Sequence, residues 1–310
     1  MNGTYPLVTF FIVSYNQEKF IAEAIDGAFA QDYPNLEIII SDDCSQDSTW
    51  DVIKEKASQY QGPHKLILNR NEPNLGPREH INKVLYNLSH GEIIVMSAGD
   101  DISRRDRVSV CVELMEKHPE VMSMSVASKY IDEEGNEILL GDWNLISAGQ
   151  YSIYTLADYI SYDFYLFSGD SRVLRRKVID AFPPLQYTYA EDIYLFVRSF
   201  LLGKVAYLRE PLVNYRQHQD SIMGKSRKKK KTKDDIYRFK ETGYKQLKAD
   251  FEFAVKNNYI TTAEVPFVEW KIEQIAHWLC PKRKTIWWRM VHRMQRCTNN
   301  FFEKILKILQ

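Results

Sequence analysis

Pairs of neighbouring carboxylates mark the places in this chain where chemistry could occur. Asp100 and Asp101 directly follow Ile93 to Ser97, a run of apolar and small residues that is typical of a buried strand. Asp42 and Asp43 follow a second run of this kind. Two adjacent negative charges repel each other, and burial strengthens the repulsion. We therefore expect a ligand at these strand ends that makes the two charges useful.

The elements that must position these residues follow from the spacing of apolar side chains. Short apolar runs alternate with segments of helical spacing, as βα units do. Strands are expected at residues 7–13, 36–41, 65–68 and 92–97, with helices between them. Strands that are apolar almost throughout indicate a parallel sheet covered on both faces. Farther along, we expect a strand at 121–132, a strand and a helix at 169–182, a helix at 190–203 and mostly helices beyond 221.

Polar side chains converge where these strands end. In a parallel sheet, ligands bind beyond the carboxyl ends of the strands. Three of the four strands end there in Tyr15-Asn16, Asp42-Asp43 and Asp100-Asp101, and the third leads into Asn74, Gly76 and Arg78. The sequence contains neither GxGxxG nor GxxxxGK[ST], which disfavours a dinucleotide site and a P-loop.

The composition sets the class of protein. A chain of 310 residues is long enough for one large α/β domain or one domain with an appendage. With 45% hydrophobic and 26% charged residues it has the composition of a soluble globular protein. No apolar run reaches the roughly 18 residues of a membrane span. Four cysteines without a CxxC pair fit a reducing cytoplasm and offer no metal framework.

The net charge of zero conceals two basic segments. Lys225 to Lys233 and residues 282–310 each carry a net charge of +7, so the rest of the chain carries −14. This division predicts an anionic partner for the late part of the chain. The first segment is interpreted as a solvated loop or as a mobile loop over an anionic substrate. No nucleic-acid-binding fold accompanies it, so no nucleic-acid partner is expected.

Five segments, in this order, resemble family 2 glycosyltransferases, and the resemblance covers roughly residues 6–220. They are VTFFIVSYNQEKFIAEAIDGAFAQDYPNLEIIISDDCSQDST, NEPNLGPREHIN, GEIIVMSAGDDISRRDRV, AEDIYLFVRSFLLG and YRQHQDS. The resemblance implies an α/β fold of the glycosyltransferase A type, with a Rossmann-like, mostly parallel sheet flanked by helices and a helical C-terminal appendage. Residues 1–220 would form the nucleotide-sugar-binding and catalytic domain. Residues 221–310 would form a basic loop and a helical region.

The resemblance also implies a divalent cation, Mn²⁺ or Mg²⁺, bound to the donor diphosphate. Such a hard cation takes carboxylates, phosphates and water as ligands and stabilises the charge of the departing diphosphate. The Asp-x-Asp motif of the family is written here as Ala98-Gly99-Asp100. The resemblance assigns metal binding first to Asp100 and second to Asp101. The alternative for Asp101 is that it caps the next helix. His218 falls where related enzymes carry a histidine near the metal.

The residues of the nucleotide-sugar donor site are likewise assigned from the resemblance. Asp42 would accept a hydrogen bond from the base or ribose, Arg78 would approach the nucleotide or form a surface salt bridge, and Arg216 would help to hold the diphosphate. The donor site predicted by the resemblance comprises Ser14, Tyr15, Asn16, Asp42, Asp43, Asn74, Arg78, Gly99, Asp100 and Arg216. The donor sugar is left open, with a slight lean towards a UDP-sugar.

Glu191 and Asp192 resemble the acidic pair that supplies the base of the family. An inverting transfer needs a carboxylate that takes the proton of the acceptor hydroxyl. The pair opens a predicted helix, where the helix dipole favours ionised carboxylates. Asp192 is the first choice for the base and Glu191 the second. The sequence lacks the QxxRW run of processive polymerases, so a single, non-processive transfer is expected.

The sequence therefore predicts an inverting, metal-dependent sugar transferase of surface polysaccharide or glycolipid assembly. Its acceptor would be a saccharide or a lipid-linked saccharide. Two alternatives stay open: a non-catalytic nucleotide-sugar-binding or scaffold protein, and a nucleotidyltransferase. The second would be expected to carry a glycine-rich phosphate loop, which SYNQEKF is not.

The C-terminal tail adds an expectation about location. Apolar residues between Trp287 and Ile308 follow steps of three and four, and basic residues lie mostly off that stripe. A helix of this kind suits an anionic membrane surface. An alternative of equal weight is that the apolar stripe packs on the domain or on a second subunit. The oligomeric state is therefore left open. We expect a cytoplasmic protein, either free or held peripherally on the inner face of the plasma membrane.

Overall fold

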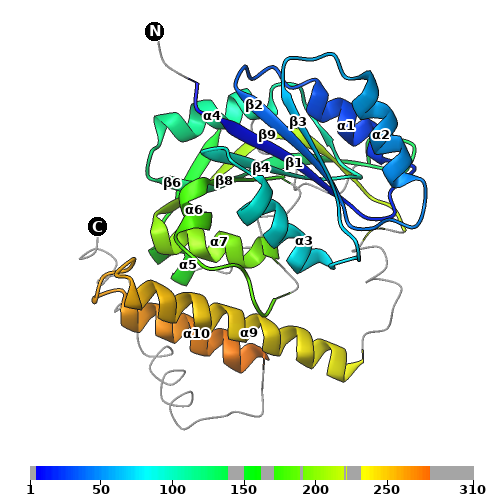
Figure 1. Ribbon diagram of the computed structural model, residues 1–310. Coiled ribbons are helices and arrows are strands. Elements are labelled where there is room, and N and C mark those ends of the chain that lie inside the picture. The colour runs from blue at the N-terminus through cyan, green and yellow to red at the C-terminus, as the bar shows by residue number, and fades with distance from the viewer. Residues whose placement is uncertain are drawn as a thin grey trace.

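A computed structural model describes residues 5–138, 150–161, 171–188, 191–219, 221 and 232–279. The basic residues 225–231 and the tail from 280 to 310 lie outside this part of the chain, and so does the predicted membrane-binding stripe. Figure 1 shows one sheet with helices on both faces and a pair of long helices packed below it.

The four predicted strands at the beginning of the chain form the parallel half of the sheet. They are β1 (Val8–Ser14), β2 (Leu36–Asp42), β3 (Lys65–Arg70) and β4 (Ile93–Ala98), in the spatial order β3-β2-β1-β4. In the register of this half, Ser14 pairs with Asp42, and Asp42 pairs with Arg70. The carboxyl ends of these strands therefore lie level with one another, as the sequence predicted.

The rest of the sheet is mixed. Its strands are β5 (Ile102–Ser103), β6 (Val121–Ile131), β7 (Tyr151–Tyr154), β8 (Arg172–Arg175) and β9 (Lys204–Arg216). β8 lies antiparallel between β4 and β6, and β9 runs parallel to β6. Because two antiparallel steps restore the direction, β6 and β9 run the same way as β4. The prediction of a mostly parallel α/β sheet is confirmed, with β5, β7 and β8 as its antiparallel members.

Helices cover both faces because successive strand residues point to opposite sides. Phe10 and Ile12 pack in one buried cluster, and Phe11 and Ile39 pack in another. The first cluster is covered by α1 (Ile21–Phe29), α2 (Thr49–Gln59) and α4 (Arg107–Lys117). The second is covered by α3 (Pro77–Lys83), the π-helical turn η1 (Val84–Leu88), α6 (Arg176–Asp180) and α7 (Glu191–Leu202).

The C-terminal helices join the domain through a third apolar cluster. α9 (Lys233–Lys256) and α10 (Val265–Leu279) pack side by side, and α5 (Leu156–Ser161) and α7 pack against them. Phe200 of α7 and Phe251 of α9 are both buried in this cluster. Thr232 and Asp235 form a reciprocal capping box that begins α9. Among the described helices, none combines the length and the apolar character that a membrane crossing requires.

Candidate active site

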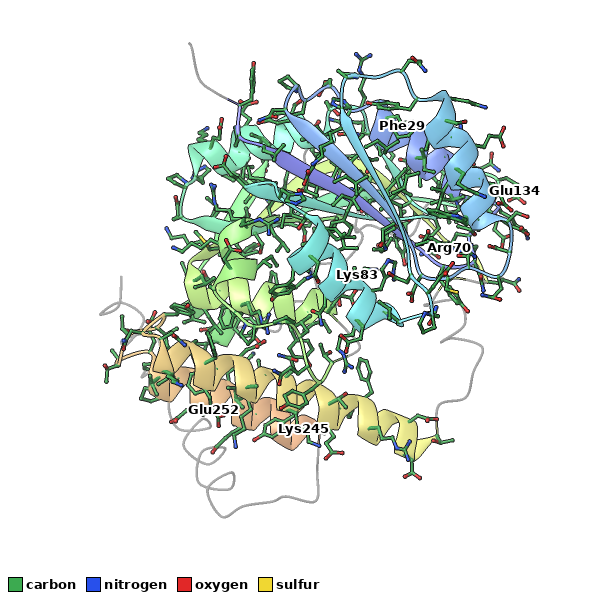
Figure 2. The ribbon with its side chains drawn as sticks, in the orientation of Figure 1. Phe29, Arg70, Lys83, Glu134, Lys245 and Glu252 are labelled. Atoms are coloured by element: carbon green, nitrogen blue, oxygen red, sulfur yellow. The ribbon has the colours of Figure 1, made fainter. Side chains whose placement is uncertain are left out.

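Asp42 ends β2 as a fully buried carboxylate. It accepts a hydrogen bond from the Ser45 backbone N–H at 2.9 Å and another from the Ser45 hydroxyl. Arg70, at the end of β3, places its Nε 3.6 Å from Asp42 Oδ2, and Figure 2 shows this arginine at the same edge of the sheet. Burial of a carboxylate is costly unless it is paired and hydrogen-bonded, and both conditions are met here. Sequence reasoning missed Arg70, although its position at a strand end was a usable signal.

Asp43 organises the turn that follows β3. Its carboxylate accepts hydrogen bonds from Asn71 Nδ2 at 2.8 Å, Leu75 N at 2.9 Å and Gly76 N at 2.8 Å. Asn74 Nδ2 donates to the Asp43 carbonyl at 2.6 Å. Gly76 has a φ of +78°, which favours glycine at this position. Asp43 and Asn74 thus shape the wall of the site by holding this turn against β2.

The loop after β1 is tied to the loop after β2. Asn16 has a φ of +53°, its backbone N–H donates to Ser45 Oγ at 2.9 Å, and its side-chain oxygen accepts from Gln46 N at 2.8 Å. Tyr15, between the strand end and Asn16, is 49% exposed. Ser14 is buried, and its hydroxyl lies 3.4 Å from Asp42 Oδ1. Of these three predicted donor residues, Tyr15 and Asn16 are exposed and Ser14 is buried.

Asp100 and His218 meet at the end of β4. Nε2 of His218 lies 3.0 Å from Oδ2 of Asp100, and the side chain of Asp100 is 13% exposed. The His218 ring packs on Phe20, with ring centroids 4.5 Å apart. Its buried Nδ1 makes no hydrogen bond with any described residue. The two predicted metal ligands, separated by more than a hundred residues in sequence, are therefore in contact.

Asp101 and Arg216 hold this corner together. Oδ1 of Asp101 accepts from the Arg216 backbone N–H at 2.9 Å, and Asp101 is 1% exposed. The Arg216 guanidinium donates to the carbonyls of Asp100, Asp132 and Glu133 and forms a 3.0 Å ion pair with Glu23. These contacts hold the backbone around Asp100 in place, and the predicted ligand roles of Asp101 and Arg216 stay predictions. α4 is preceded by Asp106, so Asp101 is not its N-cap.

Gly99 allows the end of β4 to approach the start of α1. A Cβ atom at this position would lie 2.5 Å from Gln17 Oε1 and 2.9 Å from Ile21 Cδ1. A side chain here would therefore force the Gln17 and Ile21 side chains to move. Gly99 contributes to the site by the space it leaves, which keeps Asp100 close to Phe20 and His218.

The acidic pair Glu191–Asp192 begins α7 at the same edge of the sheet. α7 packs along β6 and β9, ends at Leu202 and leads directly into β9, which starts at Lys204 beside Val121, the first residue of β6. Because β6 and β9 run parallel to β4, their first residues lie at the edge opposite Asp100. A helix that ends there begins towards the carboxyl edge, where the carboxylates gather.

Burial raises the pKa of Glu191 to about 7, and the neighbouring Asp192 carboxylate raises it as well. A hydrogen bond to its own backbone and the nearby Arg172 guanidinium act in the opposite direction without cancelling the effect. Glu191 is therefore partly protonated near neutral pH, which is the range in which a carboxyl can exchange protons with a substrate. Arg172 was not predicted from the sequence, because nothing in its local pattern sets it apart.

Arg78 lies between α3 and the segment that precedes α7. Its Nη2 makes a 2.6 Å ion pair with Glu79, and its Nη1 donates to the Gln186 carbonyl at 2.7 Å. This arrangement contains the surface salt bridge that was the alternative prediction for Arg78. It also shows that the chain five residues before Glu191 lies next to the start of α3.

The chemistry of the residues present fits a divalent cation. A carboxylate and an imidazole are both accepted ligands, and the unpartnered Nδ1 of His218 leaves the ring without a second fixed contact. The described residues contain no group of three His, Cys, Asp or Glu side chains that could hold a metal unaided. Asp100 and His218 would therefore need further oxygen ligands, which the phosphates of a donor and water can supply.

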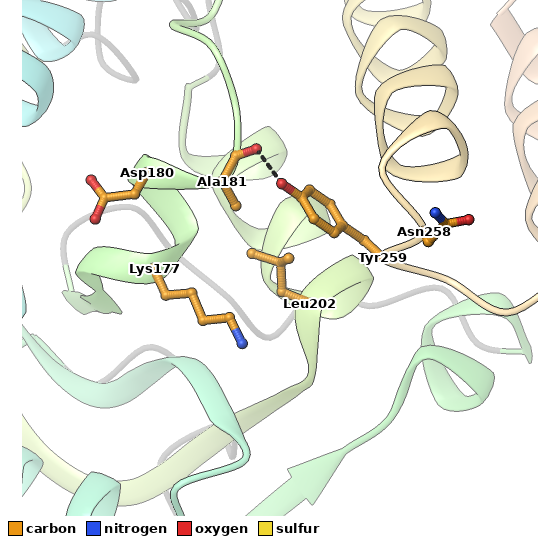
Figure 3. A pocket seen from close by; sticks show the side chains of 6 residues that line it. All are labelled: Lys177, Asp180, Ala181, Leu202, Asn258 and Tyr259. Carbon is orange, nitrogen blue, oxygen red and sulfur yellow. Dashed lines mark hydrogen bonds between the residues drawn. The ribbon is translucent and has the colours of Figure 1, made fainter.

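A separate pocket of about 580 Å³ lies where α6, the end of α7 and the chain after α9 meet (Figure 3). It is lined by Lys177, Asp180, Ala181, Leu202, Asn258 and Tyr259. Leu202 is the last residue of α7, so the pocket lies at the end of that helix remote from Glu191. We therefore place the candidate site at the strand ends and not in this pocket.

Comparison with known sequences gives one family over more than half of the chain. The sequence model described as glycosyl transferase family 2 matches residues 9–182. An uncharacterised protein of Mycobacterium tuberculosis is 31% identical over 217 residues, which are 68% of this chain and 58% of that protein. A second relative, 30% identical over 128 residues (41% of this chain and 48% of the relative), is an Escherichia coli β-1,3-glucosyltransferase. Its name specifies UDP-glucose as donor and α-D-GlcNAc-diphosphoundecaprenol as acceptor.

Solved structures share the fold at low sequence identity. Residues 1–349 of TarS from S. aureus align with a TM-score of 0.61 and 16% identity over 89% of this chain and 73% of theirs. The mannosyltransferase PcManGT from Pyrobaculum calidifontis, solved with GDP-Man and Mn²⁺, aligns with a TM-score of 0.56 and 17% identity over 95% of this chain and 80% of its own. At such identities the likeness extends to the fold alone.

Proposed function

The chain belongs to glycosyltransferase family 2 and has the A-type fold of that family, and from this premise we propose that it transfers a sugar from a nucleotide-diphosphate donor to an acceptor hydroxyl with inversion at the anomeric carbon. The observation that carries the proposal is the meeting of Asp100 with His218 at the sheet edge where Asp42 also ends its strand. A purely structural role would not require a part-exposed carboxylate beside a buried imidazole with an unpartnered nitrogen.

The nucleotide would bind over the ends of β1 and β2. Asp42 is fully buried and held in one orientation by Ser45 and Arg70, so we propose that it orders the loop over which the nucleotide binds. Tyr15 offers a 49% exposed ring at the same place, suited to covering a base. A UDP-sugar is the donor class we test first, since the named E. coli relative uses UDP-glucose.

A divalent cation would be held by Asp100 and His218 together with donor phosphates and water. When bound, it would neutralise the charge that develops on the departing diphosphate. Mn²⁺ accompanies the donor in the PcManGT structure, and we propose Mn²⁺ or Mg²⁺ here. Arg216 and Asp101 would support this corner from behind by fixing the backbone around Asp100.

The acidic pair would handle the proton of the acceptor. As the acceptor oxygen forms its bond to the anomeric carbon, the bond from that carbon to the diphosphate breaks, and the diphosphate leaves with the electron pair. Asp192 would take the hydroxyl proton, with Glu191 as its neighbour and second candidate. The raised pKa of Glu191 supports a protonated neighbour near pH 7, which would reduce the repulsion between the pair and an anionic donor.

The acceptor would be a saccharide, free or lipid-linked, in the assembly of a surface polysaccharide or glycolipid. Support comes from the E. coli relative, whose named acceptor is a diphosphoundecaprenol-linked sugar. We further propose one transfer per encounter and an intracellular location, either free or peripheral on the inner membrane face.

The experiment is a panel of nucleotide sugars with the purified chain, with and without Mn²⁺. Metal-dependent thermal stabilisation by one donor, followed by release of its nucleoside diphosphate, is the expected result. ¹H NMR of the transferred sugar then tests inversion through the anomeric configuration of the product. Donor binding without any hydrolysis or transfer would favour the non-catalytic reading, and release of pyrophosphate from a nucleoside triphosphate would favour a nucleotidyltransferase.

A further inference from the structure

The short segment between α6 and the acidic pair is held by side chains from other parts of the chain. Asn82 makes two hydrogen bonds to the Leu185 backbone: Nδ2 donates to its carbonyl at 2.8 Å, and Oδ1 accepts from its N–H at 3.0 Å. Arg78 donates to the Gln186 carbonyl at 2.7 Å. These contacts come from α3, which begins at the carboxyl edge of the sheet.

Gln246 of α9 completes this support from the C-terminal region. Its Oε1 accepts from the backbone N–H groups of both Gln186 and Tyr187, at 2.8 and 3.0 Å. Its Nε2 donates to Asp250 Oδ1 at 2.9 Å. Since Gln246 is 2% exposed, water does not replace these partners. Two N–H donors on one end and a carboxylate on the other leave the amide a single orientation.

Asp250 connects the same network back to α7. Its Oδ1 lies 2.7 Å from Nη2 of Arg198, and both side chains are almost completely buried. Gly243 lets the helices approach, because a Cβ there would lie 2.3 Å from the Tyr194 hydroxyl. Positions 243, 246 and 250 follow steps of three and four, so one face of α9 lies against α7 and the segment that leads into it.

We propose that Gln246 is a positioning residue for the acidic pair, so that α9 is part of the catalytic apparatus although it lies beyond the residues matched by the family model. Gln246 touches neither donor nor acceptor in this scheme. It fixes the chain four to five residues before Glu191, while Arg198 and Asp250 fix the helix that Glu191 begins. The proposal rests on the function proposed above, because positioning matters only if the pair takes part in the transfer.

The position of the segment before Glu191 matters because proton transfer tolerates only small changes in distance. A base must lie within hydrogen-bond reach of the proton that it removes, and a misplacement of about 1 Å can lower a rate by on the order of 10²-fold. Loss of the Gln246 oxygen leaves two N–H groups without their acceptor, and the segment can regain partners only by moving. Donor contacts at the ends of β1, β2 and β4 involve none of these atoms.

The test compares Gln246→Met, which keeps the length and approximate volume but removes the acceptor, with Tyr259→Phe. Tyr259 anchors the far end of the helical pair by donating to the Ala181 carbonyl at 3.1 Å (Figure 3), so its loss weakens the same region away from the acidic pair. We expect Gln246→Met to lower kcat by about 10- to 100-fold with a donor Kd within about threefold of wild type. We expect Tyr259→Phe to leave kcat unchanged.

Two further readouts separate positioning from loss of folded protein. Gln246→Met should displace the pH at which the rate changes, and Tyr259→Phe should not. Gln246→Glu keeps acceptor oxygens for Gln186 and Tyr187 but sets a second carboxyl against the buried Asp250, so it should recover only part of the lost kcat. The proposal is overturned if Gln246→Met keeps the wild-type kcat, or if Tyr259→Phe loses as much kcat for the same decrease in Tm.

Hydrogen exchange makes the outcome independent of the proposed reaction. The amides of Gln186 and Tyr187 should exchange faster in Gln246→Met than in wild type, and those of β1 and β2 should not change. Faster exchange in a protein that shows no transfer with any donor would refute the proposed function and leave the structural contact intact. Unchanged exchange would refute the positioning role even in an active enzyme.

Discussion

The proposed nucleotide side of the site and the acidic pair are held by contacts of different range. Asp42 and Asp43 take their partners from residues no more than 33 positions away, within adjoining βα units. The segment before Glu191 is held by Arg78 from 108 residues earlier and by Gln246 from 60 residues later. The contacts on the proposed nucleotide side therefore lie within the first half of the sheet, whereas the segment before the acidic pair also contacts α9.

This difference has a consequence for how substitutions act. A change on the nucleotide side should alter donor binding, because its network surrounds the strand ends directly. A change around α9 should alter turnover, because its network ends on the segment that carries the acidic pair. The Asp100–His218 contact lies between the two cases: it belongs to the strand ends but joins residues 118 positions apart.

The largest effect is expected for Asp192→Asn. Removal of a positioned base should lower kcat by about 10²–10⁴-fold, while the donor Kd stays close to that of wild type. Steady-state kinetics and calorimetric donor titration measure the two quantities. A variant that loses donor binding while retaining turnover at saturation would make Asp192 a substrate-holding residue and would remove the distinction between the two sides.

Asp100→Asn comes next. The loss of a metal ligand worth several kcal/mol of charge stabilisation should lower metal-dependent turnover by about 10²–10³-fold. The fold should persist, since the carboxylate ends a strand and its side chain is 13% exposed. Activity assays across a Mn²⁺ titration, with circular dichroism as the folding control, test this. Full activity that a chelator still abolishes would move the metal site elsewhere.

Substitutions in the two supporting networks, at Asp250 and at Asp43, should separate donor binding from turnover. Asp250→Asn leaves the buried Arg198 without its ionised partner and should cost about 3–5 kcal/mol of unfolding free energy. Among molecules that remain folded, kcat should fall and the donor Kd should stay unchanged. Asp43→Asn, which weakens the hold on Leu75 and Gly76, should raise donor Kd with a smaller effect on kcat. Urea unfolding, steady-state kinetics and donor titration of both variants measure these three quantities. A raised donor Kd in Asp250→Asn together with a lowered kcat in Asp43→Asn would contradict the comparison.

The smallest effect is the pH dependence of stability that Glu191 contributes. Its folded-state pKa of about 7 is above the ordinary value of 4.5, so the folded state binds this proton more tightly than the unfolded state does. The free energy of unfolding should therefore fall as pH rises from about 4.5 towards 7. Glu191→Gln should flatten that slope. It should also retain most of the turnover if Asp192 is the base; a loss as large as that of Asp192→Asn would transfer the role to Glu191.

Much of the fold could be predicted from the sequence by itself. The four apolar runs, the polar residues that follow them and the intervening helices were predicted at nearly the observed positions, as was α7. This is possible because the period of apolar residues is a local property. Convergence of the polar strand ends followed from a general rule for parallel sheets. The family was identified from the same segments and is confirmed by the match to residues 9–182.

Only the tertiary structure decided which partner each of the polar residues contacts. Asp43, Asp101 and Arg216 were predicted as ligand-binding residues, and their described contacts are with the protein itself. Gln246 and Asp250 carried no signal at all in the sequence. The physical reason is that a buried polar group acts on whichever partner the fold brings within about 3 Å. That partner lies tens of residues away in sequence, so only the packed chain determines which carboxylate faces a ligand and which one holds the fold.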